Sequence, residues 1–350
     1  MIGGGQAIGT LEGGKKCLVW GGLPGEEVIV QLTKKKSNFV EGVVTEVIKP
    51  SEQRIEPKDP ESFLSTSPWQ IMNFDTEQHY KSALIEEAFE LHDIVLPGPI
   101  TIWSDGVEYG YRNKVEYSFW FDTDKRRLSL AFFRRGTHGK IAVTGTSLAS
   151  DVINDAAVAI LDVLNELRID GRSLKTLMIR ANRSGEIAWQ LYVKEEDFDT
   201  AKVFDRAVAK NVINAEIIFS NPRSPASVIT KRLASTGDDR LTDTILDVPF
   251  RYATEGFFQI NLPVYEQALR DMKEWVEPNK PVIDLYSGVG SIGLTIGGDN
   301  VTMVEVNEHA VAEMERNIEA LGRTDTAKAV LAPSEKALDH ITTDSVIIVD

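Results

Sequence analysis

The sequence predicts a multidomain α/β protein with a β-rich N-terminal barrel, a central α+β region and a C-terminal fold built on a parallel sheet. Before residue 57, short runs rich in β-branched residues alternate with glycine-rich turns. In the middle, residues 151–167 have the spacing of an amphipathic helix, and residues 174–180 and 186–193 that of strands. Near the C-terminus, two apolar runs flank the glycine-rich segment 288–293, as in a strand, turn, helix and strand.

A stretch rich in proline and charge, residues 49–60, separates the β-rich part from the rest of the chain. Domain boundaries fall in such exposed linkers. We therefore expect three domains: a barrel at 1–57, an α+β domain at 58–250 and a nucleotide-binding type of α/β domain at 251–350.

Length and composition exclude several classes of protein. The chain has 350 residues, 42% of them hydrophobic, which is enough for two or three domains with real cores. No apolar run approaches the roughly 18 residues of a membrane span, and no basic and then apolar signal opens the chain. We expect a cytoplasmic protein with no membrane partner. The net charge of −15 argues against indiscriminate binding of nucleic acid, but does not exclude local basic patches.

The chain has a single cysteine, Cys17. A disulfide framework, a zinc cluster or an iron-sulfur cluster therefore cannot be built from this chain alone. Cys17 begins the apolar run Cys17–Trp20, which favours a packed strand residue over a catalytic thiol.

The glycine-rich turn indicates a ligand that lies against bare backbone. Glycine lets a ligand approach closely, and the first turn of the following helix presents free amide groups. Asp284 ends the first apolar run, and Glu305 ends the second at roughly the 20-residue spacing that places an acid beside a ribose diol. Two alternatives are a dinucleotide site, as in NAD-dependent oxidoreductases, and a tight turn without a ligand. The acid at Asp284 and the late position in the chain argue against the dinucleotide.

A basic stretch lies in the middle region. Arg112 and Lys114 belong to the sequence Tyr-Arg-Asn-Lys-Val-Glu, and Arg134 lies at the end of a second strand expected at Leu128–Arg135. Tyr117 and its neighbours alternate as on a half-buried strand. The expected sheet exposes a basic edge; alternatively, the arginines pair with neighbouring acids and the aromatic residues form an ordinary core.

Taken together, five segments resemble the RNA uracil-5-methyltransferase family in their order along nearly the whole chain. They are the glycine-rich barrel, Tyr-Arg-Asn-Lys-Val-Glu, Phe-Phe-Gln-Ile-Asn, Asp-Leu-Tyr-Ser-Gly-Val-Gly-Ser-Ile-Gly-Leu and the final Val-Ile-Ile-Val-Asp. The resemblance implies an OB-like TRAM barrel, a central RNA-binding domain and a C-terminal Rossmann-like class I methyltransferase fold that is incomplete.

The resemblance also implies the reaction, which is transfer of a methyl group from S-adenosylmethionine to carbon 5 of a uridine in rRNA or tRNA. In the family, a cysteine thiolate adds to carbon 6 and a base later removes the proton at carbon 5. The target base is first flipped out of the RNA. Some relatives carry three clustered cysteines in the segment that corresponds to 59–70, but this chain has none there, so no iron-sulfur cluster is expected.

Site residues carry over from the resemblance by position. Glu305 is expected to bind the ribose hydroxyls, and Tyr286 to lie against the cofactor. Relatives often have Asn or Thr at the position of Ser291. The cofactor-binding residues implied are Gln259, Tyr286, Ser291, Glu305 and Asp350, and those implied for the RNA substrate are Phe257, Arg112, Lys114 and Arg134.

The nucleophilic cysteine and the general base of the family would lie after Asp350. We therefore expect no catalytic residue within this chain, which would be a C-terminally truncated and inactive fragment. Two alternatives stay open. One is a non-catalytic RNA-binding protein with a vestigial methyltransferase fold, and the other is a methyltransferase that acts on an amine.

Overall fold

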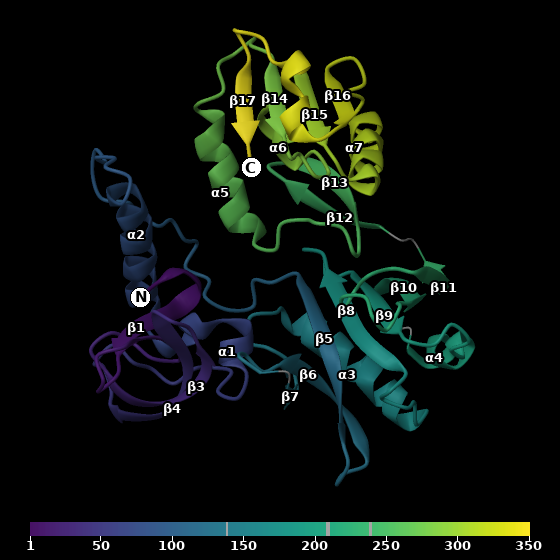
Figure 1. Ribbon diagram of the computed structural model, residues 1–350. Helices are drawn as coiled ribbons and strands as arrows, with labels where there is room; N and C mark the ends of the chain where they lie inside the picture. Colours follow the sequence, from purple (N-terminus) through teal and green to yellow (C-terminus); the bar gives the residue numbers. More distant parts are fainter. Residues whose placement is uncertain (138, 208–210, 238–239) are drawn as a thin grey trace. The chain divides into compact units, whose positions relative to one another are not determined.

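The computed structural model describes residues 1–137, 139–207, 211–237 and 240–350 (Figure 1). The chain folds into two compact units. The first unit comprises Met1–Gly110 and Tyr117–Ala149, and the second comprises Tyr111–Glu116 and Ser150–Asp350. The division into domains at 1–57, 58–250 and 251–350 stays a prediction.

The first unit opens with a four-stranded sheet in the order β1-β2-β4-β3. The pair β2 and β4 is parallel, and the other two pairs are antiparallel. Cys17 is only 1% exposed and packs with Val19 and Val40, so it is the packed strand residue that the sequence predicted. The strands, which follow the 3-10 helix η1 (Gly3–Gly5), are β1 (Gln6–Thr10), β2 (Lys16–Trp20), β3 (Glu27–Lys35) and β4 (Phe39–Lys49).

The rest of this unit combines short helices with an antiparallel sheet in the order β5-β6-β7. Asp59 joins them, because its carboxylate accepts hydrogen bonds from the Thr146 hydroxyl (2.8 Å) and from the Ser147 N–H (2.9 Å). Asn73 caps the longest helix by accepting from the N–H of Thr76. The elements are α1 (Phe63–Thr66), η2 (Pro68–Ile71), α2 (Phe74–Glu90), β5 (Lys114–Asp122, whose first residues belong to the second unit), β6 (Arg127–Phe133) and β7 (Lys140–Val143).

The second unit contains a sheet with strands in the order β11-β10-β9-β8. Leu177 and Ile179 on β8 and Trp189 and Leu191 on β9 are completely buried. The predicted helix and strands at 151–167, 174–180 and 186–193 are confirmed within a residue at each end. The elements are α3 (Asp151–Glu166), β8 (Leu174–Ala181), β9 (Ile187–Val193), α4 (Thr200–Ala207), β10 (Val212–Phe219) and β11 (Lys231–Gly237).

A β-hairpin and a helix lead into the last part of the second unit. The hairpin pairs β12 (Arg240–Ile245) with β13 (Val248–Ala253) through Leu246 and Asp247, both of which have positive φ, as two-residue hairpin turns require. Asn261 then caps α5 (Leu262–Lys273) by accepting from the N–H of Val264.

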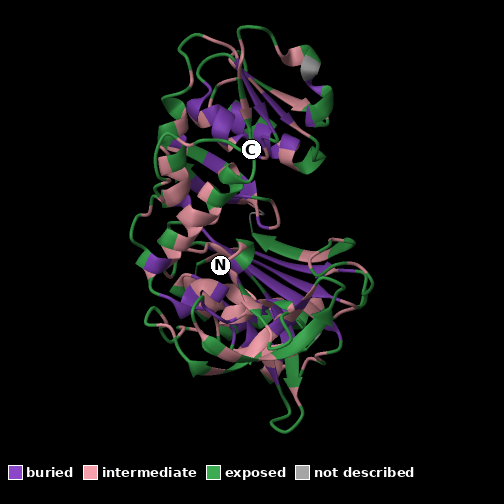
Figure 2. Ribbon diagram, turned by 60° about the vertical axis from the view of Figure 1, so that its left-hand side comes forward, coloured by how far each residue is buried: buried purple, intermediate pink, exposed green. Residues whose placement is uncertain are grey.

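The C-terminal sheet is wholly parallel and has the strand order β16-β15-β14-β17. Every residue of β14 is buried, as expected for a central parallel strand with helices on its faces, and Figure 2 shows buried residues concentrated along the strands. The mixed α/β fold is thereby confirmed. The elements are β14 (Val282–Leu285), α6 (Ser291–Ile296), β15 (Val301–Glu305), α7 (Glu308–Ala320), β16 (Ala327–Leu331), η3 (Ser334–Lys336), η4 (Leu338–His340) and β17 (Val346–Val349).

Among the helices of the described ranges, none combines the length and the apolar character that crossing a membrane requires.

Candidate functional site

The candidate site lies where the carboxyl ends of the parallel strands meet. After β14 the chain turns sharply into α6, and Tyr286, Gly288 and Gly290 all have positive φ. The Ser287 hydroxyl holds the turn by donating to the carbonyl of Asp284 (2.6 Å) and to that of Val304 on β15 (3.2 Å). The turn is therefore tied to both neighbouring strands.

The glycines of this turn serve different purposes. A Cβ on Gly293 would lie 2.6 Å from Met303 Cγ, so this glycine is required for α6 to pack against β15. A Cβ on Gly288 would meet nothing within 4 Å, which leaves the backbone of this residue open to a ligand. Of the two, only Gly288 has the open surroundings that the sequence analysis expected of a glycine at a ligand.

Asp284 lies completely buried at the end of β14. Its Oδ2 accepts from the N–H of Gly293 (2.9 Å), whereas Oδ1 has no hydrogen-bond partner among the described residues. Burial, with a further contribution from the Asp350 carboxylate, raises the pKa of Asp284 to about 7 although the Gly293 hydrogen bond opposes the shift. The carboxyl group therefore changes charge near neutral pH.

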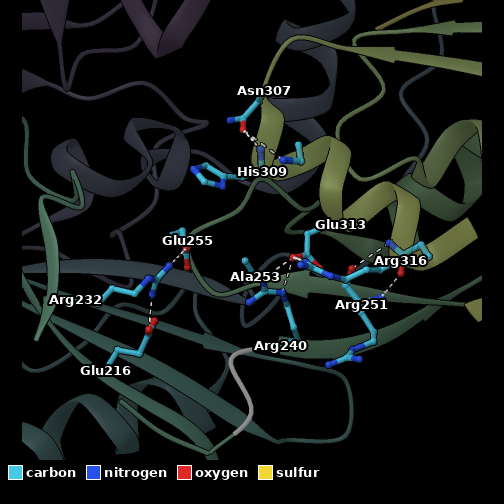
Figure 3. Close-up of polar contacts among 12 residues, drawn as sticks. Glu216, Arg232, Arg240, Arg251, Ala253, Glu255, Asn307, His309, Glu313 and Arg316 are labelled. Carbon is cyan, nitrogen blue, oxygen red and sulfur yellow. Dashed lines mark hydrogen bonds and ion pairs between the residues drawn. The ribbon is translucent and has the colours of Figure 1, made fainter. Parts of the chain in front are cut away.

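Glu305 is fixed beside the glycine turn by three backbone groups. Its Oε2 accepts from the N–H of Gly288 (3.0 Å), and its Oε1 accepts from the N–H groups of Val306 and Asn307 (2.8 Å each). Asn307 in turn caps α7 by accepting from His309, as Figure 3 shows. The carboxylate at the end of β15 is thus held in one orientation at the turn.

These elements line a small recess at the surface of the second unit. Four of the five predicted cofactor residues line it, namely Gln259, Tyr286, Ser291 and Asp350. Glu305 is not part of the lining, but it accepts a hydrogen bond from Gly288, which is part of the lining. The full lining is Phe257, Phe258, Gln259, Tyr265, Tyr286, Ser287, Gly288, Val289, Ser291, Ile292 and Asp350.

Sequence reasoning missed Tyr265. This residue lies one turn into α5, and its hydroxyl is 2.7 Å from that of Ser291. Burial, with a contribution from Asp284 and Asp350, raises the pKa of Tyr265, so the hydroxyl stays protonated. Its position four residues after the helix cap Asn261 was the one available signal.

Two aromatic side chains stand at the mouth of the recess. Phe257 is 72% exposed and Tyr286 is 45% exposed. The Tyr286 hydroxyl donates to Glu335 (3.1 Å), and its N–H donates to Ser334 Oγ (3.3 Å). Both rings are therefore available to a flat ligand.

The residues predicted to bind RNA have different surroundings. Lys114 lies 3.4 Å from Glu116 and is only 20% exposed in its side chain, and burial with the nearby Arg180 lowers the pKa of Lys114. Arg112, in the same unit, is half-buried, whereas Arg134, in the first unit, is exposed. Lys114 is therefore paired with a neighbouring acid, Glu116.

Within the described ranges, no group of three or more His, Cys, Asp or Glu side chains is placed to hold a metal ion.

No protein-family model matches the chain. A protein of Enterococcus faecalis named an uncharacterized RNA methyltransferase is 27% identical over 94% of this chain and 76% of its own length. An uncharacterized RNA methyltransferase of Thermotoga maritima is 25% identical over 89% of this chain and 72% of its own length. The chain is a relative of these RNA methyltransferases. The relationship to RNA methyltransferases that the sequence predicted is therefore confirmed.

The fold of this RNA methyltransferase relative also has a counterpart among solved structures. The crystal structure of Pyrococcus abyssi tRNA (uracil-54, C5)-methyltransferase in complex with S-adenosyl-L-homocysteine matches with a TM-score of 0.71. The match covers 93% of this chain and 79% of that one at 19% sequence identity. It shows a shared fold, and the individual roles assigned to Gln259, Tyr286, Ser291, Glu305 and Asp350 stay predictions.

Proposed function

We propose that this protein binds S-adenosylmethionine in the recess and takes part in methyl transfer to carbon 5 of a uridine in tRNA or rRNA. The observation that carries the proposal is the meeting of Gln259, Tyr286, Ser291 and Asp350 in one recess beside the Gly288–Glu305 hydrogen bond. RNA methyltransferase relatives and the shared fold support the same conclusion.

Each side chain has a role that follows from its position. The open backbone of Gly288 admits the cofactor, and the Glu305 oxygens keep lone pairs that can accept from ribose hydroxyls. The exposed ring of Tyr286 offers a flat surface to the cofactor. When bound, S-adenosylmethionine supplies a methyl group on a positively charged sulfur. Asp350 lies in the same lining and contributes negative charge that favours such a cation.

The residues that would contact RNA are assigned from the exposure and charge of their side chains. Phe257 is exposed at the mouth, where it would stack on a uracil that has been flipped out of the RNA. Arg112 and Arg134 would contact phosphates, and Lys114 would contribute less because it is paired with Glu116.

We also assign roles to the two sheets at the ends of the chain. The strand order β16-β15-β14-β17 corresponds to the first half of a Rossmann-like methyltransferase sheet, in which ligands bind at the carboxyl ends of the strands. We interpret the sheet β1-β2-β4-β3 as a TRAM-type module that binds RNA. Neither the relatives nor the fold supports the expectation that residues 1–350 are inactive.

Methylation of tRNA and rRNA with S-adenosylmethionine tests the proposal, with the digested nucleosides identified by mass spectrometry. Appearance of 5-methyluridine supports it, and a methylated amine would show that the enzyme acts on nitrogen instead. A calorimetric titration distinguishes the remaining alternative. Binding of RNA without any binding of S-adenosylhomocysteine would contradict the proposal and favour a non-catalytic RNA-binding protein.

A further inference from the structure

The segment 253–259, which brings Phe257 and Gln259 to the recess, is held by a buried arginine. Arg180 on β8 is 1% exposed, and its Nη1 donates to the carbonyls of Ala253 (3.1 Å) and Gly256 (2.9 Å). Its guanidinium also lies 5.3 Å from the centre of the Tyr252 ring. One side chain thus fixes the backbone at two points just before Phe257.

A second set of contacts holds the side chain of Glu255, which lies between those two carbonyls. Gln190 on β9 is completely buried and donates to Glu255 Oε2 (2.7 Å). Arg232 on β11 pairs with Glu255 and also with Glu216, and Figure 3 shows it between the two carboxylates. The segment is therefore fixed through a side chain as well as through its backbone.

A third anchor lies after Phe257. The Asn113 side chain donates to the carbonyl of Gln259 (2.9 Å), and the carbonyl of Asn113 accepts from the N–H of Ala181, the residue after Arg180. The Asn113 backbone is thus bonded to the residue that follows Arg180, and the two side chains hold the segment before and after Phe257.

Phe257 is far more exposed than its neighbour Phe258. Its neighbour Phe258 is 3% exposed and stacks on Tyr252 with ring centres 3.9 Å apart, whereas Phe257 is 72% exposed. Burial of an arginine is costly, and a core can usually be stabilised better by apolar side chains. Binding residues are preorganised when supporting hydrogen bonds hold them in place, and Arg180 supplies such bonds to the backbone beside Phe257.

We propose that Arg180 and Asn113 are positioning residues that set Phe257 and Gln259 for their ligands at the recess. This inference rests on the proposed function, because the ligands concerned are the cofactor and the target base. Arg180 and Asn113 act through the carbonyls of the segment and need not touch either ligand.

Amide hydrogen exchange measured by mass spectrometry tests the inference without any ligand. Arg180→Lys keeps the charge but cannot donate in the same fork, and Asn113→Ala removes the third anchor. In both variants we expect exchange in peptides covering 253–259 to become about tenfold faster, with the rest of the second unit unchanged. Unchanged exchange in this segment, or equal acceleration throughout the unit, would overturn the inference.

Arg183→Lys is the matched control. Arg183 donates to the carbonyl of Thr244 (2.9 Å) and to Glu266 (2.8 Å), so it makes similar contacts to a different part of the unit. We expect its exchange in 253–259 to match that of the wild type. If the control accelerates this segment as much as Arg180→Lys does, the assignment to Arg180 is wrong.

A titration with S-adenosylhomocysteine then separates the inference from the proposed function. We expect its affinity to fall roughly three- to tenfold in Arg180→Lys and Asn113→Ala and to stay unchanged in Arg183→Lys. Faster local exchange with unchanged affinity would show that the segment is held but not for this ligand, which overturns the inference. If the wild type fails to bind while exchange responds as expected, the proposed function falls and the anchoring itself stands.

Discussion

The hydroxyl groups of Tyr265 and Ser291 lie 2.7 Å apart and join the first turn of α5 to the first residue of α6. Both residues line the recess. The hydrogen bond therefore joins, at the recess, a helix that precedes the parallel sheet to a helix that belongs to it. Ser291 alone was expected from the sequence, and its partner gives the serine a defined orientation.

Tyr265→Phe should therefore weaken the binding of S-adenosylhomocysteine. We expect a loss of about 1 kcal/mol in binding, or roughly fivefold in Kd, because the variant lacks the neutral hydrogen bond that orients Ser291. Isothermal titration calorimetry measures the change. Tyr252→Phe is the control, since it removes another buried hydroxyl, which lies 2.6 Å from Asp243. This control should lower the free energy of unfolding without changing the affinity, and equal effects of both variants on Kd would contradict the prediction.

Gly293→Ala should destabilise the second unit. The added methyl group would lie 2.6 Å from Met303 Cγ and 3.1 Å from Asp284 Oδ2. Overpacking of this kind costs about 1–3 kcal/mol in the free energy of unfolding. Chemical denaturation measures the cost, which should be smaller when Gly293→Ala is introduced into a Met303→Ala background, because the shorter side chain leaves room for the added methyl group. A single variant as stable as the wild type would show that α6 does not pack against β15 in this way.

The stability of the protein should fall as pH rises through the neutral range because of Asp284. Burial raises the pKa of this carboxyl from 3.8 to about 7, so between these pH values the folded state binds more protons than the unfolded state. The free energy of unfolding then decreases with rising pH, by about 4 kcal/mol in total at about 1.4 kcal/mol per pKa unit.

Asp284→Asn should abolish this component of the pH dependence. An amide oxygen can still accept from the N–H of Gly293, but the group no longer titrates. Denaturation curves between pH 5 and pH 8 compare the variant with Asp299→Asn, which replaces an exposed carboxylate of the same unit. Parallel curves for the wild type and Asp284→Asn would show that Asp284 is ionised throughout this range.

RNA affinity should depend on Arg112 and Arg134 more than on Lys114. Replacing either arginine with Ala should weaken binding and lower the slope of log K against log salt by about one for each phosphate that the side chain neutralises. Lys114→Ala should have a smaller effect because its ammonium group is paired with Glu116. Arg172→Ala, which removes an exposed arginine paired with Asp170, is the control. Fluorescence anisotropy at several salt concentrations measures the slopes, and unchanged slopes would show that these side chains point away from the RNA.

Much of the site could be predicted because its residues lie close together in the chain. The turn from Asp284 to Gly293 has glycines at fixed offsets, and Glu305 follows at the spacing that two adjacent parallel strands require. Local backbone geometry and strand length determine both features. The structure accordingly places Glu305 in a hydrogen bond with Gly288, and Gln259, Tyr286, Ser291 and Asp350 in one recess.

The contacts that hold the segment 253–259 could not be predicted. Arg180 bonds to Ala253 across 73 positions in the sequence, and Asn113 bonds to Gln259 across 146. Nothing in the local pattern around Arg180 distinguishes it from an ordinary strand residue. Such contacts depend on tertiary packing, which also explains why Tyr265 was missed.

The most direct test of the account is the affinity of S-adenosylhomocysteine for the wild-type chain and for Glu305→Ala, measured by isothermal titration calorimetry. Glu308→Ala, which removes an exposed acid in the first turn of α7, controls for the change in charge. We predict saturable binding at one site in the wild type and in Glu308→Ala, and an affinity about tenfold or more weaker in Glu305→Ala. Absence of binding to the wild type, or equal affinity in Glu305→Ala, would contradict a cofactor site at the end of β15.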